Sequence, residues 1–146
     1  MKKLMIASIL GLSSLGLVAC SSDDDSTPNG NNNPMVGEWK AQTLSYTIPN
    51  GPTHEFPFTA ITDGCDVDDI ELRANNSAEL EVESKVNEVC TEAHYQGSWT
   101  EEVVTFADQN PKHVVSVSGN ELVLKYEMTY GSYGDIEVTV KYAKQD

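Results

Sequence analysis

The chain of 146 residues is poor in basic side chains: nine lysines and arginines stand against 23 aspartates and glutamates, giving a formal net charge of −14. A surface of this sign repels nucleic-acid phosphates and anionic lipid head groups. The basic residues are also scattered along the sequence, so no local basic pocket for an acidic substrate is visible. We therefore expect no nucleic-acid partner.

The sequence also lacks the residue patterns of common catalytic and metal sites. It contains no Gly-x-Ser-x-Gly nucleophile elbow, and no serine or cysteine has a recognisable base near it. His54, His94 and His113 lie on separate segments, without the helical i, i+4 spacing of a zinc site. The acidic run of residues 63–69 does not follow the EF-hand order. We predict a protein that is not an enzyme, with no catalytic residue, no metal site and no cofactor.

Long apolar runs are absent except near the N-terminus. Lys2 and Lys3 precede an apolar, small-residue stretch over residues 4–19, a layout typical of a secretory signal peptide. This stretch is shorter than the roughly 20 residues that a transmembrane helix needs, and serine and glycine interrupt it. A permanent transmembrane helix is thus the weaker interpretation, and we predict a signal peptide over residues 1–19.

The end of this stretch, Leu17-Val18-Ala19-Cys20, resembles a bacterial lipobox. The resemblance implies that Cys20 becomes the first residue of the exported chain and carries a diacylglycerol and a further acyl chain such as palmitate. Each buried CH₂ contributes about 0.8 kcal/mol, so several chains hold a protein on a membrane where one would not. The alternative is an ordinary signal peptide cut elsewhere, which leaves Cys20 as a free thiol.

Cysteine is scarce, with three residues in the chain. If Cys20 is acylated, Cys65 and Cys90 remain as an even pair in an oxidising compartment. A disulfide between them would close a loop worth about 3.5 kcal/mol in the chain-entropy description. Two separate buried thiols are the alternative, and the cysteine spacing gives little support for zinc.

Residues 21–34 contain no branched aliphatic or aromatic side chain, so this segment cannot bury enough surface to offset its ordering entropy. We predict a lipidated cysteine followed by a flexible, acidic and asparagine-rich tether over residues 20–34. The tract of residues 21–25 resembles the one that follows the lipidated cysteine in surface-exposed lipoproteins of the Bacteroidetes. Asp25-Ser26-Thr27 resembles their O-glycosylation site, at Ser26. These resemblances imply an outer-membrane location, with exposure on the cell surface as one alternative.

Alternation of apolar and polar residues with a period of two dominates from residue 37 onward. It is clearest over residues 78–82, 121–128 and 136–142. Weaker strands are expected near residues 37–47, 65–73, 94–100, 102–107 and 112–118, and a hairpin loop over residues 131–135. Eight short strands without a helical apolar stripe predict an all-β domain over residues 35–146. It is either a single antiparallel, eight-stranded up-and-down β-barrel or a β-sandwich.

Several landmarks within residues 36–142 resemble the lipocalin-like lipoproteins of the Bacteroidetes. They are the opening Gly37-Glu38-Trp39, a Cys-x-x-Asp-Asp segment at residues 65–69, and a second Gly-x-Trp at residues 97–99. The resemblance implies an eight-stranded barrel with a pocket for a small apolar ligand. The chain departs from it at residues 50–58, a longer and proline-rich first connection. Six aromatic residues are candidates either for lining the pocket or for plugging the barrel: Trp39, Trp99, Tyr46, Phe56, Phe58 and Tyr95.

We therefore expect a non-enzymatic lipoprotein, anchored to the outer membrane through Cys20, that binds a small apolar ligand. One alternative is a structural or interaction lipoprotein with a filled core, acting as an accessory subunit of an outer-membrane assembly. It would have a protein partner and an exposed apolar patch around residues 56–58. Another alternative is an enzyme inhibitor that presents residues 48–60 to a protease.

Overall fold

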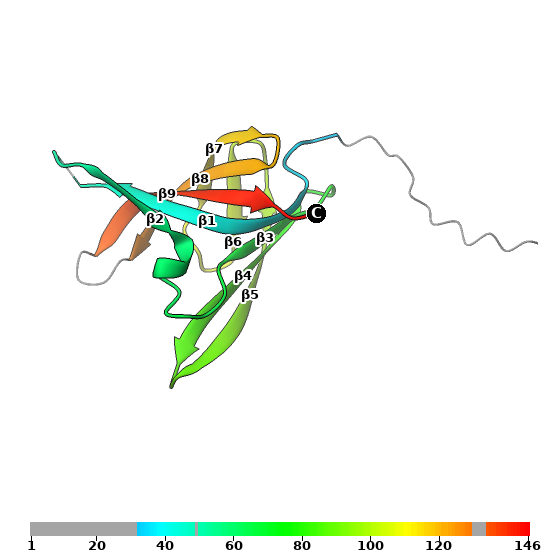
Figure 1. Cartoon of the computed structure of the whole chain (residues 1–146). Helices are drawn as coiled ribbons and strands as arrows, with labels where there is room; N and C mark the ends of the chain where they lie inside the picture. Colours follow the sequence, from blue (N-terminus) through cyan, green and yellow to red (C-terminus); the bar gives the residue numbers. More distant parts are fainter. Residues whose placement is uncertain (1–31, 49, 130–133) are drawn as a thin grey trace, which may run out of the picture.

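The computed structural model describes residues 32–48, 50–129 and 134–146. The predicted signal peptide, Cys20 and Ser26 lie outside these residues, as does most of the predicted 131–135 loop. None of the described helical segments is long and apolar enough to span a membrane. The described elements are β1 (Gly37–Thr47), β2 (Thr53–Pro57), the 3-10 turn η1 (Phe58–Ala60), β3 (Asp69–Leu72), β4 (Ser77–Val86), β5 (Val89–Trp99), β6 (Val103–Phe106), β7 (Lys112–Ser118), β8 (Glu121–Thr129) and β9 (Asp135–Lys144) (Figure 1).

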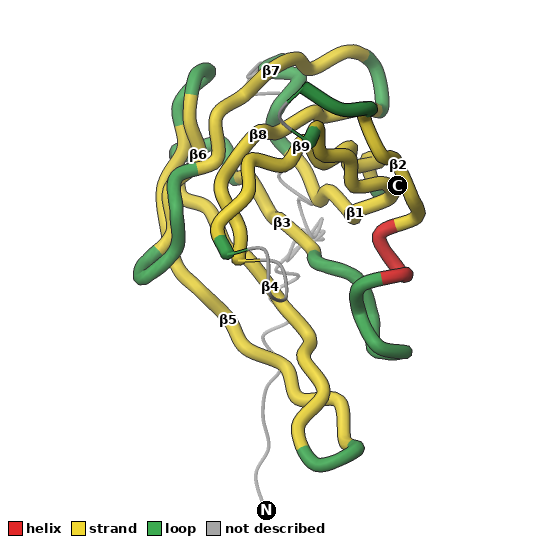
Figure 2. The backbone as a smooth tube through the Cα atoms, turned by 90° about the vertical axis from the view of Figure 1, so that its left-hand side faces the viewer, coloured by secondary structure: helices red, strands yellow, loops and turns green. Residues whose placement is uncertain are grey.

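The strands form one antiparallel sheet that closes on itself. Strands β3 to β9 follow one another in sequence order, and β1 pairs with β3 on one side and with β9 on the other. Figure 2 shows these strands as a ring. Closure leaves eight strands in the barrel, so the predicted barrel is confirmed and the sandwich alternative is wrong. A closed barrel leaves no unpaired sheet edge along most of its strands.

The first connection differs from the expected loop because it contains a strand. β2 pairs with residues 43–47 of β1, and β3 pairs with residues 37–40, so β2 and β3 lie one after the other along the same edge of β1. Residues 58–68 separate them, with η1 at their start. The strand expected near residues 65–73 is consequently shorter and begins at Asp69. Prolines at residues 52 and 57 obscured β2 in the sequence because they bound it closely.

Alternate side chains of each strand fill the barrel interior, as the period-two pattern predicts. The base of the barrel is the end where β1 and β4 begin and β9 ends. Trp39 and Trp99 lie there, 0% and 4% exposed. Trp39 Nε1 donates a hydrogen bond to the Met35 carbonyl oxygen at 2.8 Å, and Trp99 Nε1 donates to that of Arg73 at 2.9 Å. Both indole N–H groups are thus satisfied, and the base is closed by packed side chains.

The β4–β5 hairpin is paired from Ser77 opposite Ser98 to Val86 opposite Val89, and its outer part extends beyond the barrel wall (Figures 1 and 2). At its inner end, β5 turns against β6 at Gly97. A Cβ atom at this position would collide with the Thr105 carbonyl oxygen, which belongs to the neighbouring backbone. Glycine therefore permits the close approach of β5 and β6 that continues the barrel past the hairpin.

Candidate ligand-binding site

A cavity of about 410 Å³ lies at the end of the barrel opposite Trp39 and Trp99. Its wall is formed by residues 58–68, β4, the β6–β7 connection, the start of β7 and the end of β8. The volume falls in the range of about 300–1,000 Å³ that small-molecule sites occupy. The apolar part of the wall consists of Phe58, Ile61, Leu80, Val82 and Met128.

Lys112 lines this cavity together with four acidic residues, Asp68, Glu83, Asp108 and Glu127. Burial shifts the pKa of Asp68 and of Lys112, and we call these two residues the buried pair. Asp68 directly precedes β3 and is half-buried, and Lys112 is the first residue of β7 and is 4% exposed. Lys112 Nζ lies 3.4 Å from the centroid of the Tyr126 ring, a cation–π contact. Among the described residues, no carboxylate oxygen lies within 4.0 Å of Lys112 Nζ, and neither side chain of the pair has a protein hydrogen-bond partner.

Burial dominates the electrostatics of the pair. It raises the pKa of the Asp68 carboxyl to about 6 and lowers the pKa of the Lys112 ammonium to about 8. The attraction between the two groups opposes both shifts without cancelling them. Burial also raises the pKa of the Tyr126 hydroxyl, which lies 3.5 Å from that of Tyr142. Near pH 7 the pair is therefore one anion and one cation whose hydrogen-bonding capacity is unfilled by the described residues, beside three further acidic residues on the same wall.

The residue pattern around the buried pair does not mark it as a site. Asp68 lies in the acidic run of residues 63–69, but it shares the inward spacing of Ile70 and Leu72, which is a signal that it faces the interior. Lys112 was assigned to the scattered basic residues. It gave no such signal, because the residues that follow it do not alternate cleanly and the residues that surround it come from β8 and from the segment before β3.

The six aromatic candidates lie in different parts of the molecule. Phe58 lines the cavity, whereas Trp39 and Trp99 lie at the base and do not. Tyr46 on β1 and Phe56 on β2 meet edge to face, with ring centroids 6.1 Å apart. The remaining aromatic candidate is half-buried on β5, packed against the core: Tyr95.

The apolar patch expected at residues 56–58 is not exposed. Phe58 is 3% exposed and Phe56 is half-buried against the core, because η1 folds this segment over the cavity. This expectation was wrong. The large apolar side chains that are exposed in the described part of the chain are Ile48, Val86, Val89 and Val115.

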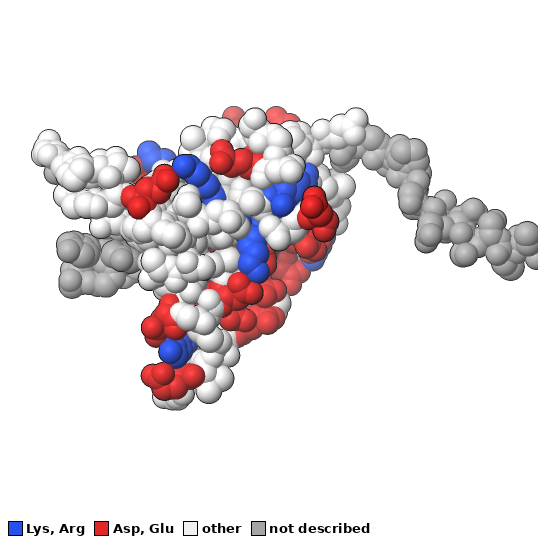
Figure 3. Space-filling view, in the orientation of Figure 1, with Lys and Arg blue, Asp and Glu red and all other residues white. Residues whose placement is uncertain are grey.

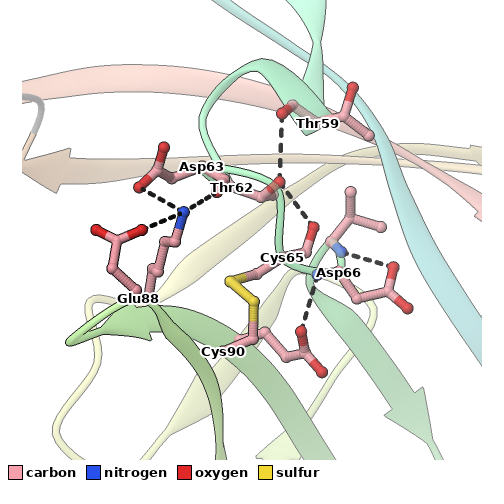
Figure 4. Close-up of a disulfide and its surroundings, with 10 residues drawn as sticks. Thr59, Thr62, Asp63, Cys65, Asp66, Glu88 and Cys90 are labelled. Carbon is pink, nitrogen blue, oxygen red and sulfur yellow. Dashed lines mark hydrogen bonds and ion pairs between the residues drawn. A yellow bond between two sulfur atoms is a disulfide. The ribbon is translucent and has the colours of Figure 1, made fainter.

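A disulfide joins Cys65 to Cys90, as the cysteine count suggested, with Cα atoms 5.6 Å apart (Figure 4). It connects the loop before β3 to β5. Lys85 reinforces the same junction, because its Nζ lies 3.4 Å from the Asp63 carbonyl oxygen and 3.3 Å from the Glu88 carboxylate. Residues 58–68, which supply one wall of the cavity, are therefore fastened covalently to the β4–β5 hairpin.

Carboxylates gather on the outer wall of β3, β4 and β5 (Figure 3). Glu71 lies opposite Glu79, and Arg73 donates hydrogen bonds to both. His94 lies between Glu79 and Glu92, and its hydrogen bond with Glu92 raises the pKa of the imidazole. These contacts with Arg73 and His94 offset part of the electrostatic repulsion between the facing carboxylates.

One group on this wall has metal-ligand chemistry that the sequence spacing did not reveal. Potential ligand atoms of Glu81, Glu92 and His94 lie within 4.8 Å of one another. Strand pairing produces this proximity, because Glu81 lies opposite His94 across the β4–β5 ladder. The histidine and Glu92 are both exposed, and the imidazole already has carboxylate partners.

Comparison with known proteins reveals no match to a protein-family model and none to a curated protein. Solved structures do share the architecture. The bovine lipocalin allergen Bos d 2 aligns with a TM-score of 0.50 and 20% identity over 77% of this chain and 73% of that chain. A bovine odorant-binding protein in complex with a selenium-containing odorant aligns with a TM-score of 0.50 and 15% identity over 77% and 71%. The chain therefore has a lipocalin-like fold.

Proposed function

We propose that this chain is a non-enzymatic, lipid-anchored outer-membrane protein that binds a small, partly apolar ligand in the mouth of its barrel. The observation that carries the proposal is the cavity of about 410 Å³, closed at the base by packed side chains and open at the other end. Its wall combines apolar side chains with a few polar groups, the composition that small-molecule sites share. Lipocalin-like barrels typically bind small hydrophobic molecules, which agrees with this use of the fold.

Ligand binding is tested by blocking the cavity. The full chain is isolated from cells, incubated with a lipid extract and analysed by native mass spectrometry. Val82 lies on the cavity wall, so Val82→Trp should fill the space and remove any bound mass. Val115→Trp is the matched control because Val115 is 56% exposed and lies off the cavity wall. A mass retained by the control and lost in Val82→Trp supports the proposal, whereas no bound mass, or equal binding in both variants, contradicts it.

The anchor is tested separately. Its support is the resemblance of residues 17–20 to a lipobox, together with the cysteine arithmetic that pairs Cys65 with Cys90 and leaves Cys20 over. Labelled palmitate should enter the wild-type chain and bring it into the outer-membrane fraction. The Cys20→Ser variant should take up no label and leave that fraction. Unlabelled wild-type protein, or a membrane-bound variant, would refute the anchor and leave the cavity proposal intact.

A further inference from the structure

We infer that the ligand is a zwitterionic amphiphile, with an anionic and a cationic group close together on an apolar body, as in an α-amino acid with a long aliphatic side chain. This inference rests on the proposed ligand-binding function. It is carried by the buried pair, which places one cation and one anion on the wall of the same cavity. Neither charge has a hydrogen-bonding or ion-pairing partner among the described residues.

The unfilled hydrogen-bonding capacity of the pair points to a ligand. A buried charge without a partner costs several kcal/mol, which is why buried ions are normally paired and hydrogen-bonded. Here the Lys112 ammonium lies over the Tyr126 ring, and the lysine lines the cavity together with the half-buried Asp68. The two groups are farther apart than 4.0 Å, so they do not form a direct ion pair. A ligand that bridges them satisfies both at once.

The charges around the pair exclude simpler head groups. A carboxylate alone would pair with Lys112 and would meet Asp68, as well as the cavity-lining Glu83, Asp108 and Glu127. An amine alone would pair with Asp68 and meet Lys112. An alcohol could bridge the two groups, but hydrogen bonds between two charged partners are roughly twice as strong as neutral ones. A zwitterion supplies each buried charge with its opposite and adds no net charge to an acidic mouth.

The apolar wall accounts for the rest of the ligand. Phe58, Leu80 and Val82 lie on the same cavity surface as the pair, so a bound head group leaves an aliphatic chain against apolar side chains. Each buried CH₂ contributes about 0.8 kcal/mol. Affinity should therefore rise with chain length until the chain reaches the open mouth.

Four probes with the same eight-carbon chain test the inference: octanoic acid, octylamine, octanol and 2-aminooctanoic acid. Isothermal titration calorimetry on the full chain at pH 7 should give 2-aminooctanoic acid an affinity at least tenfold higher than that of the other three. Asp68→Asn combined with Lys112→Met should abolish this preference while circular dichroism shows the barrel intact. Lys125→Met is the matched control. Lys125 precedes Tyr126 on β8, but it does not line the cavity, and its ammonium lies 2.8 Å from the Glu137 carboxylate.

Each other outcome identifies which inference fails. If octanoic acid or octanol binds as well as the amino acid, the head-group inference is overturned and the cavity proposal stands. The head-group inference is likewise overturned, and the cavity proposal stands, if no probe binds while the lipid extract still yields a bound mass that Val82→Trp removes. If neither probes nor extract bind, the proposed function itself fails. A preference that survives in the double variant shows that residues other than the buried pair recognise the head group, which also overturns the inference.

Discussion

Replacing the buried pair by uncharged side chains of similar size, Asp68→Asn with Lys112→Met, should stabilise the barrel. One pKa unit corresponds to about 1.4 kcal/mol. The pKa of Lys112 falls from 10.5 to about 8 and that of Asp68 rises from 3.8 to about 6 on folding, so keeping each group charged costs roughly 3 kcal/mol. Relaxation reduces such costs, and buried ion pairs replaced by uncharged groups typically yield about 1–4 kcal/mol. We expect a gain in that range at pH 7.

The pH dependence of this gain follows from the direction of the two shifts. A raised carboxyl pKa favours the folded state below pH 3.8, and this contribution is lost as the pH rises through about 6. A lowered ammonium pKa favours the folded state above pH 10.5, and this contribution is lost as the pH falls through about 8. The wild-type barrel is therefore least stabilised by these two groups between about pH 6 and 8, where the double variant should gain most.

Urea unfolding followed by tryptophan fluorescence measures the effect, because Trp39 and Trp99 are buried at the base. Lys112→Met alone should be less stable than the wild type at pH 7, since it leaves the Asp68 carboxylate without its cation, and should recover toward pH 4. A double variant less stable than the wild type at pH 7, or a difference that does not change between pH 4 and 10, would refute the assignment of both residues as charged and unpartnered.

Three further predictions concern the disulfide, a strand contact and ligand affinity. Cys65→Ser with Cys90→Ser should lower the unfolding free energy by about 3.5 kcal/mol, measured by urea titration, and adding reductant to the wild type should have the same effect. Gly97→Ala should cost about 1–3 kcal/mol in the same assay because its methyl group collides with the Thr105 backbone, and an unchanged midpoint would contradict the close approach of β5 and β6. Affinity for 2-aminooctanoic acid should be highest between about pH 6 and 8 and fall on either side as one member of the buried pair loses its charge; a flat calorimetric profile from pH 5 to 9 would count against the pairing.

The alternating pattern was sufficient to predict the barrel because most strands have one wet and one buried face. Residues 78–82 alternate alanine, leucine and valine with glutamate, and the structure places the glutamates outside and Leu80 within the core. β2 was missed because it is five residues long, mostly exposed and bounded by prolines, so its only support is pairing with β1. Such pairing depends on residues distant in sequence.

The candidate site was less predictable than the fold for the same reason. A lysine at the start of a strand normally reaches solvent, but Lys112 is 4% exposed, with its ammonium over the Tyr126 ring of β8 and close enough to Asp68 for the two charges to interact. The environment of Lys112 thus combines three separate segments: β7, β8 and the loop before β3. The cysteines were an exception, since a count of three, with Cys20 assigned to the lipid anchor by its resemblance to a lipobox, suggested which two form the bridge.

The Cys65–Cys90 bridge gives the two sides of the mouth unequal freedom. The side formed by residues 58–68 is tied to the β4–β5 hairpin through a covalent link and the Lys85 contacts, so its position relative to that hairpin is fixed. The facing side, residues 108–110 and the end of β8, has no disulfide in the described part of the chain and is joined by a hydrogen bond from Asn110 Nδ2 to the Glu127 carbonyl oxygen at 3.0 Å. Oxidation of the two cysteines therefore sets the position of one side of the mouth, whereas non-covalent contacts alone hold the other among the described residues.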